Sequence, residues 1–377
     1  MQFKIQRRHL AKRLQQAIQI ISSKTVIPIL SGLKLELNEQ ELILTGSNSD
    51  ITIQAKIPQN IDGEDIITNI QPGSIVLPVP QLPDIINKLP EDIVDFTVDE
   101  NYKTVIKSGK AVFRLYGQSS DEYPKLSLQQ NKSQLSINIK DLKKMIRQTV
   151  FAVSTMETRP IFTGVNMILE NNQLTFTATD SHRLSRKTIA IEEHQLDQTN
   201  IVIPGKSLQE LNRVLDEKDE HVQVSLLNNQ IIFSTENLFL SSRLLNGQFP
   251  DTNRLIPQDS ETTMKVHVNE FIHMIERAAV LSNKEQNNVI DIETEDNLIR
   301  ISSKLVEIGN VNEQLNAISI EGEPIKLSFS SKYMLDSLKT IDSDVVDIYF
   351  SGPMKPFIIK APNDPHILQL ILPVKTF

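Results

Sequence analysis

The chain has 377 residues, and its 39 basic and 47 acidic side chains give a formal net charge of −8. It contains no cysteine, which excludes disulfide bonds, thiolate catalysis and cysteine-ligated metal sites. The first residues lack the apolar stretch of a signal peptide, and no segment approaches the ~20 apolar residues of a membrane-spanning helix. We therefore expect a soluble, cytoplasmic protein.

Three long segments of the chain share one pattern. Residues 32–46, 164–178 and 288–302 each place a leucine ten positions after the first residue, at Leu42, Leu174 and Leu298. A second pattern at 76–89 recurs at 202–215 and, more weakly, at 328–341. Solenoid repeats have periods of about 20–50 residues, so a repeat this long is a whole domain. We predict three copies of one domain, at 1–125, 126–253 and 254–377.

Each copy begins with a short strand and an amphipathic helix. The apolar residues of these helices recur at the i, i+4, i+7 spacing of a buried stripe: Leu10, Leu14, Ala17, Ile18 and Ile21, then Leu142, Ile146, Val150 and Val153, then Phe271, Ile275 and Ala279. Alternating strands follow, such as 33–37 and 42–44, and then a second helix at about 80–89, 206–215 and 332–341. Each domain is predicted to be two β-α-β-β-type halves, an α+β fold with antiparallel sheets.

The predicted helices carry basic side chains opposite their apolar stripes. These are Arg8 and Lys12 in the first copy, Lys140, Lys144 and Arg147 in the second, and Lys206, Arg213, Lys332 and Lys339 on the second helices of the later copies. The first helix of the third copy departs from the pattern, with Asn269, His273 and Glu276. The basic residues either solvate an exposed face or meet a polyanion. No aromatic residues interleave with them, which disfavours base stacking, so the polyanion would be duplex DNA bound without sequence preference.

Two short motifs were weighed as catalytic sites. Pro204–Ser207 resembles the end of a phosphate-binding loop, but Asn200 occupies the position of the required first glycine. The segment from Thr179 to Arg183 contains the hydrolase-type residues Asp180, Ser181 and His182. Adjacent residues rarely form a catalytic triad, so a binding surface or a turn is preferred there, and a hydrolase stays a competing hypothesis.

The C-terminal segment 367–377 is apolar. Most of it is predicted to be a closing strand of the third domain. Because Pro373 cannot donate a ladder hydrogen bond, the last residues are expected to leave the sheet and lie on the surface, where an apolar tail indicates a protein or peptide site.

These features together resemble the bacterial DNA polymerase III beta subunit family, the replicative sliding clamps. The resemblance covers the whole chain and depends on the threefold repeat, on Thr179–Leu184, on Gly247–Asp251 and on the final Leu-Pro-Val tail. It implies a non-enzymatic processivity factor that needs no cofactor. It also implies a head-to-tail homodimer that forms a ring around duplex DNA, with antiparallel sheets outside and helices lining the channel. Lys24 matches a DNA-contacting position of the family.

The resemblance further implies a hydrophobic cleft for peptides of the polymerase catalytic subunit, the clamp loader and other replication and repair proteins. The matching positions are Phe162, Thr179, Ser181, His182, Arg183, Leu184, Pro250, Arg254, Leu255, Met354, Pro356, Leu370, Leu372, Pro373 and Val374. Two positions depart from the family: Ser181 replaces a frequent glycine, and Leu372-Pro373-Val374 replaces a Met-Pro-Met tail.

For the dimer contact, the resemblance implies that Phe113 and Leu115 of one chain meet Val280 and Leu281 of the next. A head-to-tail contact closes only if the successive rotations complete a full turn. The competing hypothesis is a protein-interaction scaffold whose basic helices never contact DNA.

Overall fold

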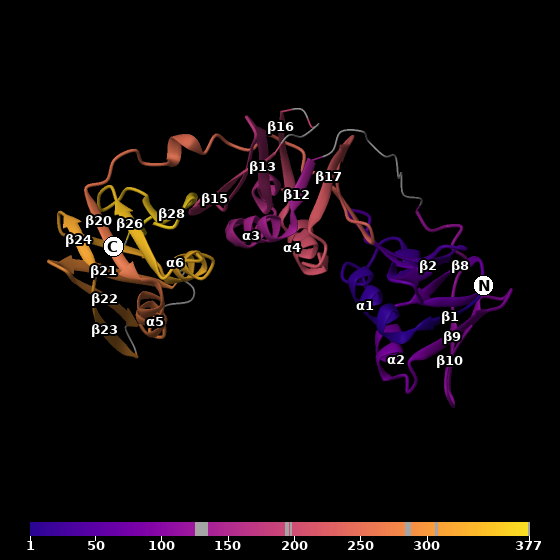
Figure 1. The fold of residues 1–377 in the computed structure, drawn as a ribbon. Helices are drawn as coiled ribbons and strands as arrows, with labels where there is room; N and C mark the ends of the chain where they lie inside the picture. Colours follow the sequence, from indigo (N-terminus) through magenta and orange to yellow (C-terminus); the bar gives the residue numbers. More distant parts are fainter. Residues whose placement is uncertain (125–134, 193–195, 197, 283–287, 306–307, 376–377) are drawn as a thin grey trace. The chain divides into compact units, whose positions relative to one another are not determined.

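The computed structural model describes residues 1–124, 135–192, 196, 198–282, 288–305 and 308–375 (Figure 1). The first copy contains β1 (Gln2–Gln6), α1 (Arg7–Ala17), η1 (Pro28–Ser31), β2 (Gly32–Leu37), β3 (Glu41–Ser47), β4 (Ile51–Pro58), β5 (Asn60–Ile61), β6 (Glu64–Asp65), β7 (Ile67–Gln71), β8 (Gly73–Pro78), α2 (Leu82–Lys88), β9 (Ile93–Val98), β10 (Lys103–Ser108) and β11 (Ala111–Tyr116).

The later copies repeat this order. The second contains β12 (Leu135–Asn138), α3 (Ile139–Thr149), η2 (Val150–Ala152), η3 (Pro160–Thr163), β13 (Gly164–Glu170), β14 (Gln173–Thr179), β15 (Arg183–Ala190), β16 (Thr199–Pro204), α4 (Gly205–Val214), β17 (His221–Leu227), β18 (Gln230–Ser234) and β19 (Leu238–Arg243). The third contains η4 (Asn253–Leu255), β20 (Thr262–His267), α5 (Val268–Ala279), β21 (Val289–Glu295), β22 (Leu298–Leu305), β23 (Gly309–Asn316), β24 (Ser319–Gly322), β25 (Lys326–Ser330), α6 (Ser331–Leu338), β26 (Val345–Phe350), β27 (Phe357–Ala361) and β28 (Asp364–Ile371).

The apolar stripes of the first helices are buried as the sequence predicts. Leu10 and Leu14 of α1, Leu142 and Ile146 of α3, and Phe271 and Ile275 of α5 are each at most 2% exposed. The residues at the ends of the stripes, Ile18, Ile21, Val153 and Ala279, are only half-buried. In the first and second copies this is because the regular helix has ended before them, at Ala17 and Thr149. No helix among the described residues is both long and apolar enough to cross a membrane.

The sheets are continuous across neighbouring copies. One eight-stranded sheet has the order β12-β17-β18-β19-β4-β3-β2-β8, so half of it comes from the second copy and half from the first. The nine-stranded sheet, in the order β16-β13-β14-β15-β28-β27-β26-β20-β24, joins the second and third copies in the same way. Within the described residues, the strands of these sheets pair antiparallel. The predicted α+β fold with antiparallel sheets is therefore confirmed.

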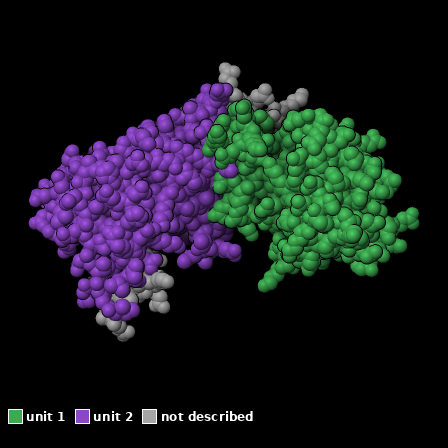
Figure 2. Space-filling view, turned by 60° about the horizontal axis from the view of Figure 1, so that its bottom comes forward, with its two compact units in different colours: residues 1–140, 194–196, 206–244 green, residues 141–193, 197–205, 245–377 purple. Residues whose placement is uncertain are grey.

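This sharing of strands divides the chain into two compact units (Figure 2). Unit 1 is Met1–Lys140, His194–Leu196 and Lys206–Leu244, and unit 2 is Asp141–Glu193, Asp197–Gly205 and Leu245–Phe377. The second copy contributes one half-sheet to each unit, because each half continues a half-sheet of a neighbouring copy. The three-domain division predicted from the sequence stays a prediction.

The first and third copies each have one half-sheet that no neighbouring copy continues. The first copy has a five-stranded sheet in the order β11-β10-β9-β1-β7, with β11 at its edge. The third copy has a four-stranded sheet in the order β23-β22-β21-β25, with β23 at its edge. In the repeat, β11 corresponds to β19 and β28, and β23 corresponds to β4 and β15. Unpaired strand edges offer backbone donors and acceptors to another chain.

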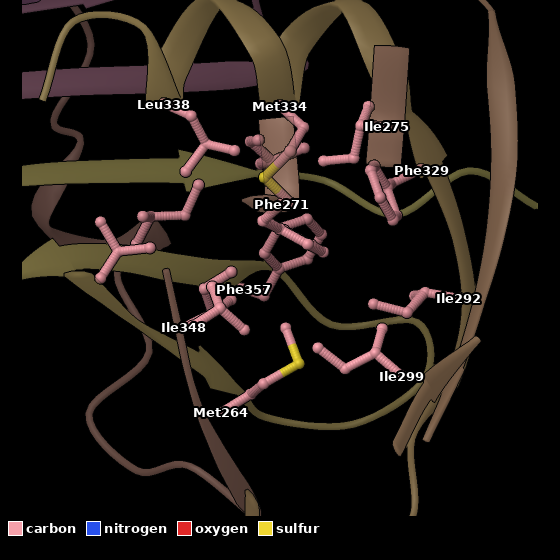
Figure 3. Packing of buried hydrophobic residues seen from close by; sticks show 14 of the residues in the cluster. Met264, Phe271, Ile275, Ile292, Ile299, Phe329, Met334, Leu338, Ile348 and Phe357 are labelled. Atoms are coloured by element: carbon pink, nitrogen blue, oxygen red, sulfur yellow. The ribbon is translucent and has the colours of Figure 1, made fainter. Parts of the chain in front are cut away.

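The third copy has a single core between its two sheets and its two helices (Figure 3). Phe271 of α5 is fully buried, and the figure shows it among Met334, Phe329 and Phe357. The Phe329 and Phe357 rings meet edge to face, with their centroids 6.0 Å apart. A core of this kind holds α5 and α6 against the strands that form the site described below.

Truncating Phe271 tests this packing. We expect Phe271→Ala to lower the free energy of unfolding by about 3–5 kcal/mol, because it removes a buried ring and leaves a cavity. Phe271→Leu should cost clearly less. Urea unfolding of both variants measures the difference, and equal stability of Phe271→Ala and the unsubstituted chain would contradict the described core.

Candidate functional site

The turn from β14 to β15 is organised by Asp180. One oxygen of its carboxylate accepts hydrogen bonds from the backbone N–H groups of His182 and Arg183, at 2.9 and 3.0 Å. The other oxygen accepts from Arg183 Nε at 3.0 Å. These bonds hold Ser181 at φ +78°, in the left-handed region, where glycine has no steric cost. The turn presents Ser181 and His182 to solvent and buries Arg183.

Arg183 connects this turn to two helical segments. Its guanidinium donates to Asp336 of α6 at 2.6 Å and to the Phe151 carbonyl of η2 at 2.7 Å. It also lies over the Tyr333 ring, 4.6 Å from the ring centroid. With Asp180, these partners satisfy a charge that is only 7% exposed, and a buried charge needs such partners. The rigid fork of arginine makes several directed bonds that lysine could not.

Tyr333 forms the floor beneath His182. The two rings are nearly parallel, 19° apart, with their centroids 6.4 Å from each other. Burial raises the pKa of the Tyr333 hydroxyl, and the negative charge of Asp180 adds to the effect. Tyr333 and Asp336 are not among the residues predicted from the sequence. The one available signal was an aromatic residue on a helix that otherwise exposes Lys332 and Lys339.

The C-terminal tail lies against the same turn. β28 ends at Ile371, and the backbone N–H of Leu372 then donates to the His182 carbonyl at 2.9 Å. Val374 donates to the Ser328 carbonyl of β25 at 2.7 Å. The predicted departure from the sheet before Pro373 is confirmed, and the tail is fixed by these two bonds with its side chains half-buried.

The end of β19 and the residues just after it make the same two bonds. The N–H of Arg243 donates to the Asp50 carbonyl, and that of Leu245 donates to the Val202 carbonyl, both at 2.9 Å. Arg243 and Asp50 thus replace Leu372 and His182, and their side chains form an ion pair at 3.9 Å. The backbone hydrogen bonds are therefore equivalent, but the side chains at the first bonded pair differ. They are charged in unit 1, and apolar and aromatic in unit 2.

Several of the predicted apolar cleft residues belong to unit 2. Leu184 pairs with Leu370 across β15 and β28, and both are buried. Phe162 is half-buried and meets Phe249 edge to face, with the ring centroids 6.1 Å apart. Met354 is 59% exposed.

The remaining predicted residues lie on two segments. Thr179, at the end of β14, is buried and donates its hydroxyl to the Arg183 carbonyl at 2.6 Å. Pro356 is half-buried and precedes Phe357, which pairs with Ile371. Pro250, Arg254 and Leu255 lie at or just before η4 and are exposed. Arg186 of β15 holds this segment by donating to Thr252 and Asn253 at 2.7 and 2.9 Å. That all these side chains line one peptide cleft stays a prediction.

The alternative catalytic role of Asp180 and His182 gains no support from the geometry. The carboxylate of Asp180 bonds the backbone and Arg183, while the His182 ring stacks on Tyr333. Gly205, in the motif that resembles a phosphate loop, is the first residue of α4. No group of three or more metal-ligating side chains occurs among the residues that were placed.

The predicted DNA-facing cations fall into two groups. Six are held in ion pairs: Arg8 with Glu64, Lys12 with Asp216, Lys144 and Arg147 with Asp342, Arg213 with Glu210, and Lys339 with Glu276. The other four, Lys24, Lys140, Lys206 and Lys332, are exposed. In the described part of the chain, none of these four has a carboxylate within ion-pair distance. The sequence could not show this difference, because the carboxylates come from distant segments.

The predicted dimer residues lie on the two free ends of the repeat. Phe113 and Leu115 are half-buried on the edge strand β11. Val280 caps the C-terminus of α5 and is 76% exposed, and Leu281 follows it half-buried. Whether these residues meet in a dimer stays a prediction.

The three copies match three successive domain families. Residues 1–127 match the DNA polymerase III beta subunit, N-terminal domain, residues 136–251 its central domain, and residues 253–375 its C-terminal domain. The chain therefore belongs to the DNA polymerase III beta subunit family. This membership confirms the expected fold of three clamp domains, and it confirms that the chain is not an enzyme, because sliding clamps are non-enzymatic processivity factors.

Individual relatives agree over the full length. The beta sliding clamps of Staphylococcus epidermidis RP62A and Staphylococcus aureus Mu50 are each 43% identical over 377 residues, which is 100% of both chains. The crystal structure of the DNA polymerase sliding clamp from Bacillus subtilis is 45% identical, covers 100% of both chains and has a TM-score of 0.96. The DNA polymerase III beta chain from Streptococcus pneumoniae is 36% identical, with a TM-score of 0.95 and 100% coverage of both chains.

The charge pair that joins β15 to β28 gives a pH prediction for this site. Lys187 is 5% exposed and donates to Asp364 at 2.6 Å. Burial alone would raise the pKa of Asp364, but hydrogen bonds from Lys187 and Lys144 outweigh it and lower the pKa below its ordinary value. The folded state therefore binds its proton less tightly than the unfolded state. The pair contributes stability above the unfolded pKa and loses it as the pH falls through the folded pKa.

We expect Asp364→Asn to cost about 1.5–3 kcal/mol at pH 7, as for a hydrogen bond to a charged group. The cost should disappear as the pH falls below about 4. Unfolding in urea at a series of pH values measures it. Glu293→Gln, which breaks the exposed pair with Lys326, is the control and should change little. A loss that stays constant from pH 7 to pH 3 would contradict the assignment.

Proposed function

We propose that this chain is a DNA sliding clamp, which encircles duplex DNA and tethers the replicative polymerase as a processivity factor. The observation that carries this proposal is the match of the whole chain, in three consecutive domains, to the DNA polymerase III beta subunit family. The ring would stay on DNA because it encloses the duplex and not because it adheres to it. A chain with a net charge of −8 could therefore still be retained. The chain would work in the cytoplasm.

The unpaired ends of the repeat support a head-to-tail homodimer. β4 pairs with β19, and β15 pairs with β28, so each copy joins the next by the same kind of strand contact. The remaining strands of this kind are β23 and β11. If β23 of one chain pairs with β11 of another, two chains of three domains can close a ring of six. Phe113, Leu115, Val280 and Leu281 would lie at this contact.

Duplex DNA would pass through the ring beside the helices. The domain division at 1–125, 126–253 and 254–377 would place the sheets outside and the helices inside. The exposed cations Lys24, Lys140, Lys206 and Lys332 are free to contact phosphates, which carry no sequence information directly. Soft contacts of this kind are screened within about 8–10 Å at physiological salt, which suits sliding.

Partner proteins would dock on the turn and tail of unit 2. Exposed Met354 and Leu255 and half-buried Leu372 supply apolar surface, while His182 supplies a ring and a polar edge. This combination suits a short peptide with apolar anchors. The polymerase catalytic subunit, the clamp loader and other replication and repair proteins would share the site.

Topological retention is tested on DNA of two shapes. Loaded on a nicked circle, the chain should stay bound through gel filtration and be lost when a restriction enzyme linearises the DNA. The physical reason is that a closed ring leaves only over a free end. Both DNAs have the same charge, so equal retention on the circle and on the linear form would contradict encirclement.

Peptide docking is tested with Leu372→Ala and His182→Ala. A fluorescent peptide from the polymerase catalytic subunit should bind about tenfold more weakly to each, since loss of one buried contact costs about 1–3 kcal/mol. Arg243→Ala, at the position equivalent to Leu372 in unit 1, is the matched control and should bind normally. Unchanged affinity in both site variants would remove the assigned cleft.

A further inference from the structure

Two residues of α1 hold the C-terminal end of α4. Lys12 pairs with Asp216, which follows α4 by two residues. The side-chain amide of Gln16 donates to the carbonyl of Val214, the last residue of α4, at 2.7 Å. We call this set the first junction, since it lies on the same two copies that β4 and β19 join.

Three residues of α3 make similar contacts with the segment that follows α6. Lys144 pairs with Asp342 at 3.7 Å and, more closely, with Asp364 of β28 at 3.2 Å. Arg147 adds a bond to the Asp342 carboxylate at 2.6 Å. Gln148 donates its side-chain amide to the Thr340 carbonyl at 3.1 Å. This set is the second junction, on the copies that β15 and β28 join.

The two junctions use equivalent residues of the repeat. Lys12 and Lys144 are each the sixth residue of their helix, and Gln16 and Gln148 are each the tenth. Asp216 and Asp342 are 126 positions apart, as are Val214 and Thr340, which is the spacing of the equivalent core residues Leu208 and Met334. Four interacting positions therefore recur together.

The free ends of the repeat lack these residues. The sixth and tenth residues of α5 are His273 and Arg277, and Arg277 is held by Glu313 of β23. The position after α2 that corresponds to Asp216 is Pro90. The lysine–aspartate and glutamine–carbonyl contacts thus occur where two copies of one chain meet.

We infer that two ion pairs, Lys12 with Asp216 and Lys144 with Asp342, act as junction locks: they hold neighbouring copies together on the helical side. We also infer that DNA contact falls mainly to the unpaired cations. This second part, on DNA contact, rests on the proposed function. The last carbonyls of a helix have no partner within it, and Gln16 supplies one at Val214 of α4. Gln148 donates to the Thr340 carbonyl, two residues after the end of α6. A cation near a helix C-terminus is also favoured by the helix dipole, and Lys12 and Lys144 are so placed.

The burial of these groups supports the assignment. The aspartate side chain of the first junction is 24% exposed, less than half of the 51% of Lys12, and Gln148 of the second junction is 1% exposed. The hydrogen bond from Lys12 lowers the pKa of Asp216 below its ordinary value, so the Asp216 carboxylate is charged throughout the neutral range.

A charge swap in the full-length chain tests the lock. Lys12→Asp should lower the midpoint of thermal unfolding by about 2–4 °C, because it places two carboxylates together. Adding Asp216→Lys should restore most of that loss. If Lys12→Asp does not fold, the milder Gln16→Leu and Lys12→Met take its place and should each lower the midpoint.

The same swap at Lys326 and Glu293, an exposed pair that the repeat does not share, is the control and should move the midpoint little. Absence of any destabilisation at Lys12, or failure of the swap to restore it, would overturn the lock.

Direct binding to short linear duplex DNA tests the second part independently, because topology cannot hold the chain there. Lys206→Ala and Lys332→Ala, at equivalent positions of α4 and α6, should each weaken this binding and reduce the slope of its salt dependence by about one. Asp216→Asn should strengthen the binding, because it frees Lys12 for phosphate.

Weaker binding of Asp216→Asn to linear duplex DNA would overturn the division between locks and DNA contacts. If none of these variants alters binding to linear DNA but the charge swap still restores stability, the assignment of DNA contact to the unpaired cations fails while the lock stands. The proposed clamp function itself fails only if retention on circular and linear DNA is equal.

Discussion

Antiparallel pairing between half-sheets of neighbouring copies is the constraint on which the rest of the structure depends. β4 with β19 and β15 with β28 convert three repeated domains into two continuous sheets. The second copy is divided between the two compact units for this reason. Every later feature, including the turn at Asp180, the tail and the helix contacts, lies beside one of these two strand pairs.

The two strand pairs have the same backbone and different chemistry. The bonds at Leu372 and Val374 in unit 2 repeat those at Arg243 and Leu245. On the same backbone, the strand pair in unit 1 carries a charged pair of side chains. The strand pair in unit 2 carries an apolar tail beside His182. A repeated fold can thus hold one specialised site without repeating that site, because function resides in side chains and not in the fold.

Much of the fold could be predicted from the sequence, because its signals are local. The stripes of α1, α3 and α5 follow helical spacing, and Pro373 marks the point where the tail leaves β28. The division into two units could not be predicted, since strand pairing between copies depends on contacts distant in sequence. Tyr333 and Asp336 were missed for the same reason: their role appears only once Arg183 is seen to contact them.

On the basic helices, the sequence does not show which cations are paired with a carboxylate. Charge counting treats Lys12 and Lys206 alike, but Asp216 binds the first and no described carboxylate pairs with the second. A cation that already has a partner contributes less to the field that a phosphate meets. The surface that DNA would meet is therefore less positive than the sequence suggests, which favours loose contact.

Cryo-electron microscopy of the full-length chain in solution tests the proposed ring most directly. We expect a closed particle of two chains, with β11 of each paired to β23 of the other around a hole wide enough for duplex DNA. A particle with no hole, or one in which β11 and β23 remain unpaired, would contradict the proposed ring.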